Sequence, residues 1–195
     1  KPISLSSPPV SIEILEEIKG PVDHIGIGID AVTNDIRKKI KPNYNPLIFW
    51  DYMGKALDVF GKNRVIGHII VGIGEDLKQI ALTAKKIRKA GAKISLFSYQ
   101  SKNNPPPDME YYRKAQLVTY LIENGKEVKD ALEIVKHKPI LAVDIIENGK
   151  AFQTRGCPGC NRPFYTTRPG REHRNYPRPP SKKEISKIKV ELNIV

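Results

Sequence analysis

Short apolar runs alternate with amphipathic stretches along the first hundred residues of the chain. Four runs rich in isoleucine and valine predict β-strands near residues 3–5, 22–29, 65–73 and 94–98. The third run shows no polar alternation, so we expect both of its faces to be covered, as in a parallel sheet. A further apolar run at 140–146 predicts a last strand.

The stretches between these runs carry apolar residues at helical spacing. We expect helices at 11–20, 34–40, 45–61, 77–91, 109–124 and 128–135, several of which end at a glycine. Strands that alternate with helices favour right-handed crossovers and a parallel sheet. We therefore predict an α/β fold, an incomplete parallel (β/α) barrel that spans residues 1–150.

The charge adds a second region to this picture. The 195 residues contain 33 Lys and Arg against 21 Asp and Glu, a formal net charge of +12. Ten of these basic residues and only three acidic ones lie in 151–195, which is rich in Arg, Pro and Gly as far as 180 and ends in a short helix or a final strand. We predict an irregular basic C-terminal module there. It favours anionic partners, nucleic acid among them, although a solvated tail or a heat-adapted composition explains the charge as well.

The composition also sets the cellular context. The apolar runs are too short to cross a membrane, and two cysteines exclude a disulfide-rich scaffold and fit a reducing cytoplasm. The chain has no apolar leader at Lys1 and enters a strand within three residues, so we expect the folding unit to begin before this chain does.

Two of the predicted strands end in glycines followed by a carboxylate. Gly26 and Gly28 lead to Asp30, and Gly72 and Gly74 lead to Glu75. The carboxyl ends of parallel strands share one edge, where α/β proteins bind their ligands. A helix-capping Asp and the acidic start of the next helix are the plain alternatives for the two carboxylates.

The C-terminal module contains one C-x-x-C pair, Cys157 and Cys160. This spacing suits two thiolates on one tetrahedral metal ion, a small redox disulfide, or two inert thiols. A zinc site or an iron–sulfur cluster needs more ligands than these two cysteines, and His173 is a candidate third. Arg155 and Arg162 flank the pair, and arginines of this kind suit a phosphate or a carboxylate.

We interpret the other three histidines as core or surface residues rather than as ligands. His24 and His68 lie on apolar strands, so we expect satisfied core histidines. His137 precedes a Lys-Pro pair and is expected at the surface.

Taken together, these stretches resemble the C-terminal half of a radical S-adenosylmethionine (SAM) enzyme. Segment 23–31 resembles the family's fourth strand region, which ends in a polar residue that contacts the ribose. Segment 68–75 resembles the fifth strand pattern G-x-I-x-G-x-x-E, with Ile70 and Glu75 in place and His68 where the first glycine belongs. Residues 92–99 resemble the sixth strand and its exit loop, and the C-x-x-C segment resembles archaeal relatives of biotin and lipoyl synthases.

The resemblance implies a role for each candidate residue. The SAM adenosine pocket would be shaped by Asp30, Gly72, Gly74, Glu75 and Ser98. Cys157 and Cys160 would hold an accessory metal or cluster, or bind a sulfur-bearing substrate. Arg155 and Arg162 would hold a carboxylate or an acidic carrier protein, so the substrate is a small molecule or is bound to a carrier.

The sequence departs from the family in one respect. A C-x-x-x-C-x-x-C loop defines the family and binds the [4Fe–4S] cluster that cleaves SAM into methionine and a 5′-deoxyadenosyl radical, but this chain has no such loop. We therefore expect part of a transferase of the sulfur-inserting type that is inactive alone. Its N-terminal half is missing through truncation, processing or a split gene, in which case a complementing N-terminal chain supplies it, or the chain is a relic that keeps the scaffold without the chemistry. A homodimer is the other way to cover an exposed edge. The second hypothesis is a non-catalytic module that binds a metal or nucleic acid, and the third is a barrel enzyme that binds phosphate or flavin.

Overall fold

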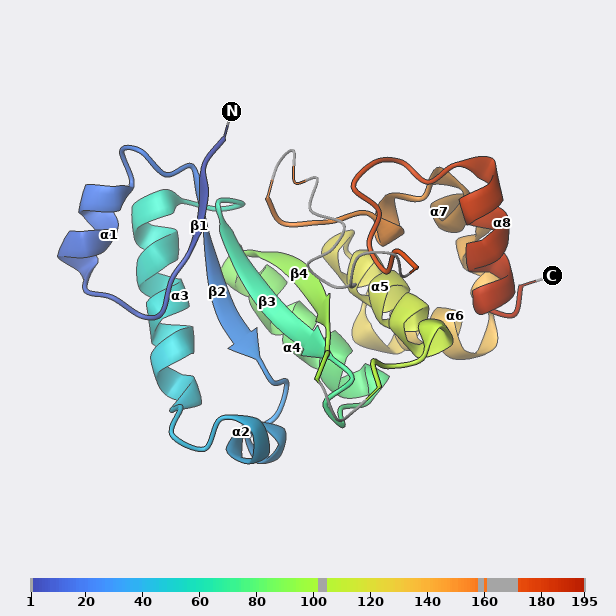
Figure 1. Cartoon of the computed structure of the whole chain (residues 1–195), viewed down its shortest axis with the longest axis horizontal. Helices are drawn as coiled ribbons and strands as arrows, with labels where there is room; N and C mark the ends of the chain where they lie inside the picture. The colour runs from blue at the N-terminus through green and yellow to red at the C-terminus, as the bar shows by residue number, and fades with distance from the viewer. Residues whose placement is uncertain (1, 102–104, 158–159, 161–171, 195) are drawn as a thin grey trace.

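Four strands lie side by side in one parallel sheet (Figure 1). This computed structural model describes residues 2–101, 105–157, 160 and 172–194. The strands follow their sequence order and are β1 (Ser4–Ser6), β2 (His24–Asp30), β3 (Val65–Val71) and β4 (Lys93–Ser98). The predicted α/β fold with a parallel sheet is confirmed. Over the described residues the sheet is open, with β1 and β4 as its two edges.

Helices lie between the strands and after β4, in the predicted places. They are α1 (Ile12–Ile18), α2 (Asn34–Ile40), α3 (Pro46–Phe60), α4 (Leu77–Ala90), α5 (Met109–Glu123) and α6 (Val128–His137). Local signals place their ends. The side chain of Asn45 accepts the N–H of Leu47 (3.0 Å), Asp76 and Gln79 form a capping box, and Gly91 ends α4 in the left-handed conformation.

The last predicted strand is wrong. Its residues form a 3₁₀ helix, η1 (Pro139–Ala142), and a short helix, α7 (Val143–Asn148). Ala142 and Ile146 are buried and lie four residues apart, which is the spacing of one helix face rather than of one strand face. An apolar run of this length has no period clear enough to separate the two structures.

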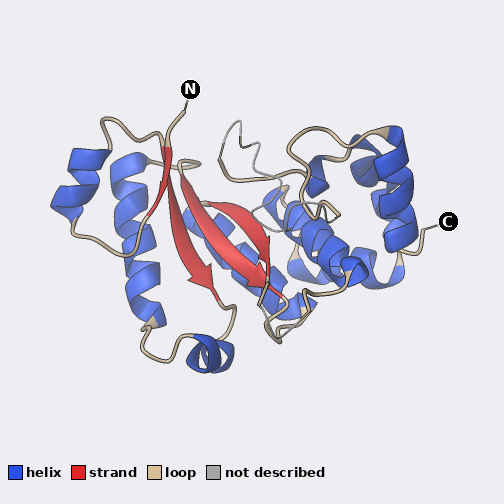
Figure 2. Ribbon diagram, in the orientation of Figure 1, coloured by secondary structure: helices blue, strands red, loops and turns tan. Residues whose placement is uncertain are grey.

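The two faces of the sheet are covered unequally. One face, which includes Ile25, Ile27 and Ile69, is fully buried against α3, α4 and α5. We call the other the open face. Its residues alternate with the buried set and are His24, Gly26, Gly28, Ile66, His68, Ile70, Lys93, Ser95 and Phe97. In Figure 2 no helix among the described residues lies over the near side of β2 and β3, and seven of the nine open-face residues are half-exposed.

The C-terminal region folds back on α5 (Figure 1). It contains η2 (Lys150–Phe152) and α8 (Lys182–Glu191), so the chain end is helical. A short parallel bridge joins Gln153 to Tyr176, and Tyr176 belongs to the same buried hydrophobic cluster as the strands. None of the helices in the described part of the chain has the length and apolar content of a membrane span.

Candidate functional site

Asp30 ends β2 in an unusual backbone conformation. Its φ is +56°, and it follows a register shift between β2 and β3. The carboxylate folds back over Gly28, where a Cβ atom would lie 3.2 Å from Oδ1, so the carboxylate stands on the open face. Lys41 donates to Oδ2, and no partner of Oδ1 is found among the described residues. Asp30 is not a helix cap, because Thr33 caps α2, so Oδ1 is left to accept a hydrogen bond from a ligand.

His68 lies at the centre of the open face. Its ring covers Gly26, where a Cβ atom would lie 2.5 Å from Cε1, and packs edge-on against Phe97 with ring centroids 4.9 Å apart. Burial lowers the pKa of His68 to about 4, and the negative charge of Asp30 acts in the opposite direction. The imidazole is therefore neutral near pH 7. The apolar pattern of the strand predicted a core histidine. It did not predict that His68 lies on the half-exposed side of the sheet, beside a carboxylate.

Glu75 turns toward its own loop. Its two carboxylate oxygens accept the backbone N–H groups of Gly72 (2.6 Å) and Ile73 (2.8 Å). The hydroxyl of Tyr111, on α5, donates to the Glu75 carbonyl (2.6 Å) and lies 3.3 Å from Oε1. Burial, and next the charge of Glu75, raise the pKa of Tyr111. The structure records no contact between Glu75 and Asp30. The two carboxylates, which the sequence predicted at one edge of the sheet, have different hydrogen-bond partners.

The other three predicted pocket residues also differ in what surrounds them. Gly72 (φ +100°) gives room to the 105–107 loop, because a Cβ atom there would lie 2.7 Å from Cδ of Pro107. Gly74 (φ +105°) faces open space, because a Cβ atom there would meet no side chain or backbone within 4 Å beyond its chain neighbours. Ser98 pairs with Val71 in the register of the covered face, and its hydroxyl donates to the Tyr99 carbonyl (3.4 Å). Of the five predicted residues, Gly74 is exposed and faces open space, and Asp30, 9% exposed, keeps Oδ1 without a partner among the described residues.

Arg37 on α2 is a buried cation that sequence reasoning missed. It is 3% exposed, and Nη2 donates to the carbonyls of Ile29 and Ala31 at the end of β2. Its Nε and Nη1 atoms have no partner among the described residues. Burial lowers its pKa, and Asp30 raises it. The guanidinium thus fixes α2 to the strand end that carries Asp30. A basic helix directly after a strand was the only signal for it.

Arg155 and Cys157 lie at the other end of the sheet. They line a cleft of about 630 Å³ together with residues that precede β3 and β4, namely Lys62, Asn63, Gly91 and Ala92. Because these residues stand at the starts of parallel strands, the cleft is at the amino edge, whereas Asp30 and Glu75 follow the carboxyl ends. The predicted substrate and metal residues are therefore not brought to the predicted cofactor residues.

The side chains of this second site have partners within the chain. Arg155 pairs with Glu123 through Nη1 and donates to Thr119 Oγ1 (2.7 Å) through Nη2. Cys157 and Cys160 are free, half-buried thiols, and the N–H of Cys160 donates to the carbonyl of Cys157 (3.2 Å). The described residues contain no group of three or more His, Cys, Asp or Glu placed to hold a metal ion. Arg162 lies outside the described residues.

Comparisons with known proteins identified no relative of this chain. No family model, no curated protein and no solved structure matches the chain.

Proposed function

We propose that the chain is the C-terminal portion of a radical SAM enzyme of the biotin and lipoyl synthase type, and that its open face contributes the adenosine pocket. The observation that carries the proposal is the position of Asp30. It ends β2, and its carboxylate lies on the same half-exposed side of the parallel sheet as His68. Ligands of parallel α/β proteins bind at this end of the strands.

The residues of the open face fit a nucleoside. Asp30 offers Oδ1 as an acceptor for ribose hydroxyls and is held by Lys41. Ile70, which pairs with Phe97 across β3 and β4, is half-exposed and provides an apolar surface for a flat base. Gly74 leaves free space at the end of β3. Neutral His68 can donate or accept one hydrogen bond beside these groups.

The cluster of the radical SAM family does not fit the described residues. They contain no set of three candidate ligands, and Cys157 lies at the opposite edge from Asp30. The cluster's ligands therefore belong to a complementing segment, and no chemical step is assigned to this chain. Its contribution in the proposal is to bind and orient the adenosine part of SAM, and Cys157 with Cys160 serves an accessory role away from it.

Binding of S-adenosylhomocysteine to the full chain, followed by calorimetry, tests the proposal. Asp30→Asn removes the charged acceptor and is expected to weaken binding about tenfold. The matched control is Asp35→Asn, an exposed carboxylate on α2, which should change nothing. Gly74→Leu is expected to block the site. Gly61→Leu is its control, because Gly61 also has a positive φ (+85°) and open space around it but precedes β3.

Three results would overturn the proposal. A folded chain that does not bind the analogue excludes the adenosine pocket. Equal losses in each variant and its control place the ligand elsewhere. Production of 5′-deoxyadenosine by this chain alone, after reconstitution with iron and sulfide, contradicts the assignment of the cluster to another segment.

The amino-edge cleft favours nucleic acid as a second candidate function. Four of its lining residues are basic. Arg155 is paired with the one carboxylate of the lining, Glu123, and the other three are Lys62, Arg88 and Lys93. RNA titration at two salt concentrations measures this directly, because phosphate contacts give a binding constant that falls steeply with salt.

A further inference from the structure

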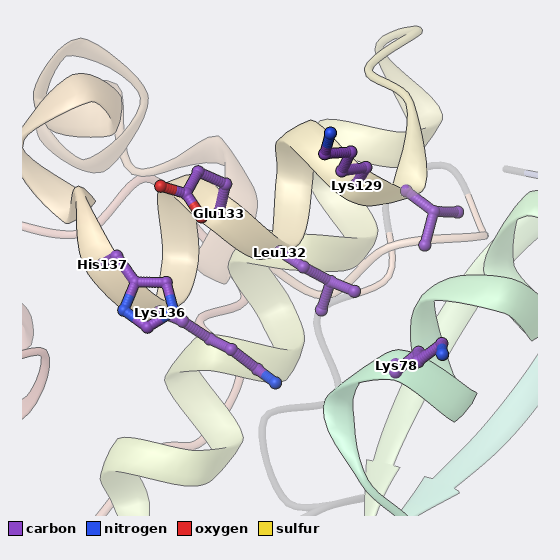
Figure 3. Close-up of a pocket in the computed structure, with 7 residues that line it drawn as sticks. Lys78, Lys129, Leu132, Glu133, Lys136 and His137 are labelled. Atoms are coloured by element: carbon purple, nitrogen blue, oxygen red, sulfur yellow. The ribbon is translucent and has the colours of Figure 1, made fainter.

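A groove separates α4 from α6 on the outer surface of the molecule (Figure 3). Its volume is about 410 Å³. The lining comes from the first turn of α4 and from one side of α6, and consists of Lys78, Val128, Lys129, Leu132, Glu133, Lys136 and His137. None of these residues belongs to the open face or to the amino-edge cleft.

The floor of the groove is apolar. Val128 and Leu132 are half-buried and lie one helical turn apart on α6, so they form a short stripe. Figure 3 shows Leu132 and Lys136 extending from α6 on the side where Lys78 stands.

The rim of the groove carries a net positive charge. Lys78, Lys129 and Lys136 are exposed, and none of them forms an ion pair with the described residues. Glu133 is the one carboxylate of the lining, and it pairs with Lys138 outside the groove (3.3 Å). Three lysines and one carboxylate therefore surround the apolar stripe.

The two walls are held in place by the fold. Lys85 on α4 pairs with Glu127 at the start of α6 (2.5 Å). On α6, Ala131 and Val135 are buried next to Val128 and Leu132 on the same helix face, which packs against the core. The groove is thus preformed, which lowers the entropic cost of binding a partner.

We propose that this groove docks an acidic amphipathic helix of a partner protein. A helix that presents apolar residues one turn apart matches the stripe on α6, and carboxylates beside them match the lysine rim. The concave surface with two apolar floor residues differs from the broad apolar face that inserts into a lipid surface. The lining has no arginine and, apart from His137, no ring on which bases could stack.

Fluorescence anisotropy with a synthetic peptide tests the proposal. The probe is a labelled amphipathic helix of about 18 residues with leucines on one face and glutamates beside them. We expect saturable binding that weakens with salt. Lys129→Glu combined with Lys136→Glu is expected to weaken binding about tenfold or more. Lys38→Glu combined with Lys39→Glu changes the net charge equally on exposed positions of α2 and should leave most of the binding intact.

Additional probes separate the groove from general charge attraction. A scrambled peptide of the same charge should bind poorly, and Leu132→Ala should weaken the amphipathic peptide several-fold. Equal binding of the two peptides, or equal losses in the two lysine double variants, overturns the proposal. Binding to phosphatidylserine vesicles that depends on Lys129 and Lys136, without peptide binding, also overturns it and identifies a lipid surface instead. None of these results depends on the adenosine pocket.

Discussion

His68 shows how one side chain can define the character of a sheet face. Its ring occupies the space that Gly26 leaves on β2, and both residues sit on the side that no helix among the described residues covers. A larger residue at position 26 would displace the ring. The glycine, which the sequence pattern suggested as room for a ligand, is thus first of all room for a histidine.

The depressed pKa of His68 predicts a pH effect on stability. Above pH 6.5 the histidine is neutral in both the folded and the unfolded chain. As the pH falls from 6.5 toward 4, the unfolded chain binds a proton that the folded chain does not, so the folded state loses stability. Relative to His68→Gln, the wild-type free energy of unfolding should fall by about 1–3 kcal/mol over this range in urea titrations. His137→Gln, at an exposed position, serves as control, and parallel curves for His68→Gln and wild type would contradict the prediction.

At the scale of elements, α5 organises the C-terminal region through one buried arginine. Arg113 is fully buried and donates to Glu191 of α8 (2.7 Å) and to the backbone carbonyls of Arg174 (2.6 Å) and His173 (3.0 Å). Nearby, Gln116 donates to Asn175 (2.6 Å). Burial raises the pKa of Tyr112, which lies in the same network, to about 12. Polar contacts of this kind join segments that lie far apart in the chain.

Removal of Arg113 should release this region. Arg113→Met removes the arginine that pairs with the largely buried Glu191 carboxylate and donates to two backbone carbonyls, so we expect a loss of about 3–5 kcal/mol in the free energy of unfolding and faster proteolysis within 172–194. Arg178→Met is the contrast. Arg178 forms two bonds to Glu184, of 2.8 and 2.9 Å, which lower the pKa of that carboxyl to about 2. Because the Arg178 side chain is 58% exposed, its removal should cost much less stability than the removal of Arg113. Similar losses in both variants would show that burial does not decide the difference.

For the whole molecule, the most consequential feature is the outer edge of β1. Within the described residues β1 pairs only with β2, so its other backbone groups are free to pair with a further strand. Ile3 and Leu5 beside this edge are 54% and 37% exposed. The edge is where we place the complementing segment of the proposed function, and in its absence a second copy can compete for it.

Leu5→Lys should therefore reduce association. We expect sedimentation equilibrium to show concentration-dependent self-association of the chain, weakened about tenfold by a charge on the edge strand. Leu47→Lys is the matched control, because Leu47 is 72% exposed at the start of α3, away from the edge. Identical association constants for the two variants would place the contact elsewhere.

Much of the fold follows from local pattern. Residues close together in the sequence predict the four strands, the capped start of α4 and the glycine that ends α4. Backbone geometry fixes the spacing of apolar positions in each element and the residue types that suit helix ends. The same logic places Asp30 and Glu75 directly after parallel strands. It fails at 140–146, where a short apolar run fits a strand and a helix equally well.

What each polar group contacts was decided only by tertiary structure. Asp30 stands on the open face while Glu75 binds its own loop, and Arg155 with Cys157 lies at the amino edge, although all four carried similar signals for a ligand site. The partner of Arg113 is 78 residues away, and that of Arg155 is 32 residues away. The burial and the partner of a polar side chain depend on which segments pack together in space. The pattern of residues within one segment does not predict which other segments it will contact.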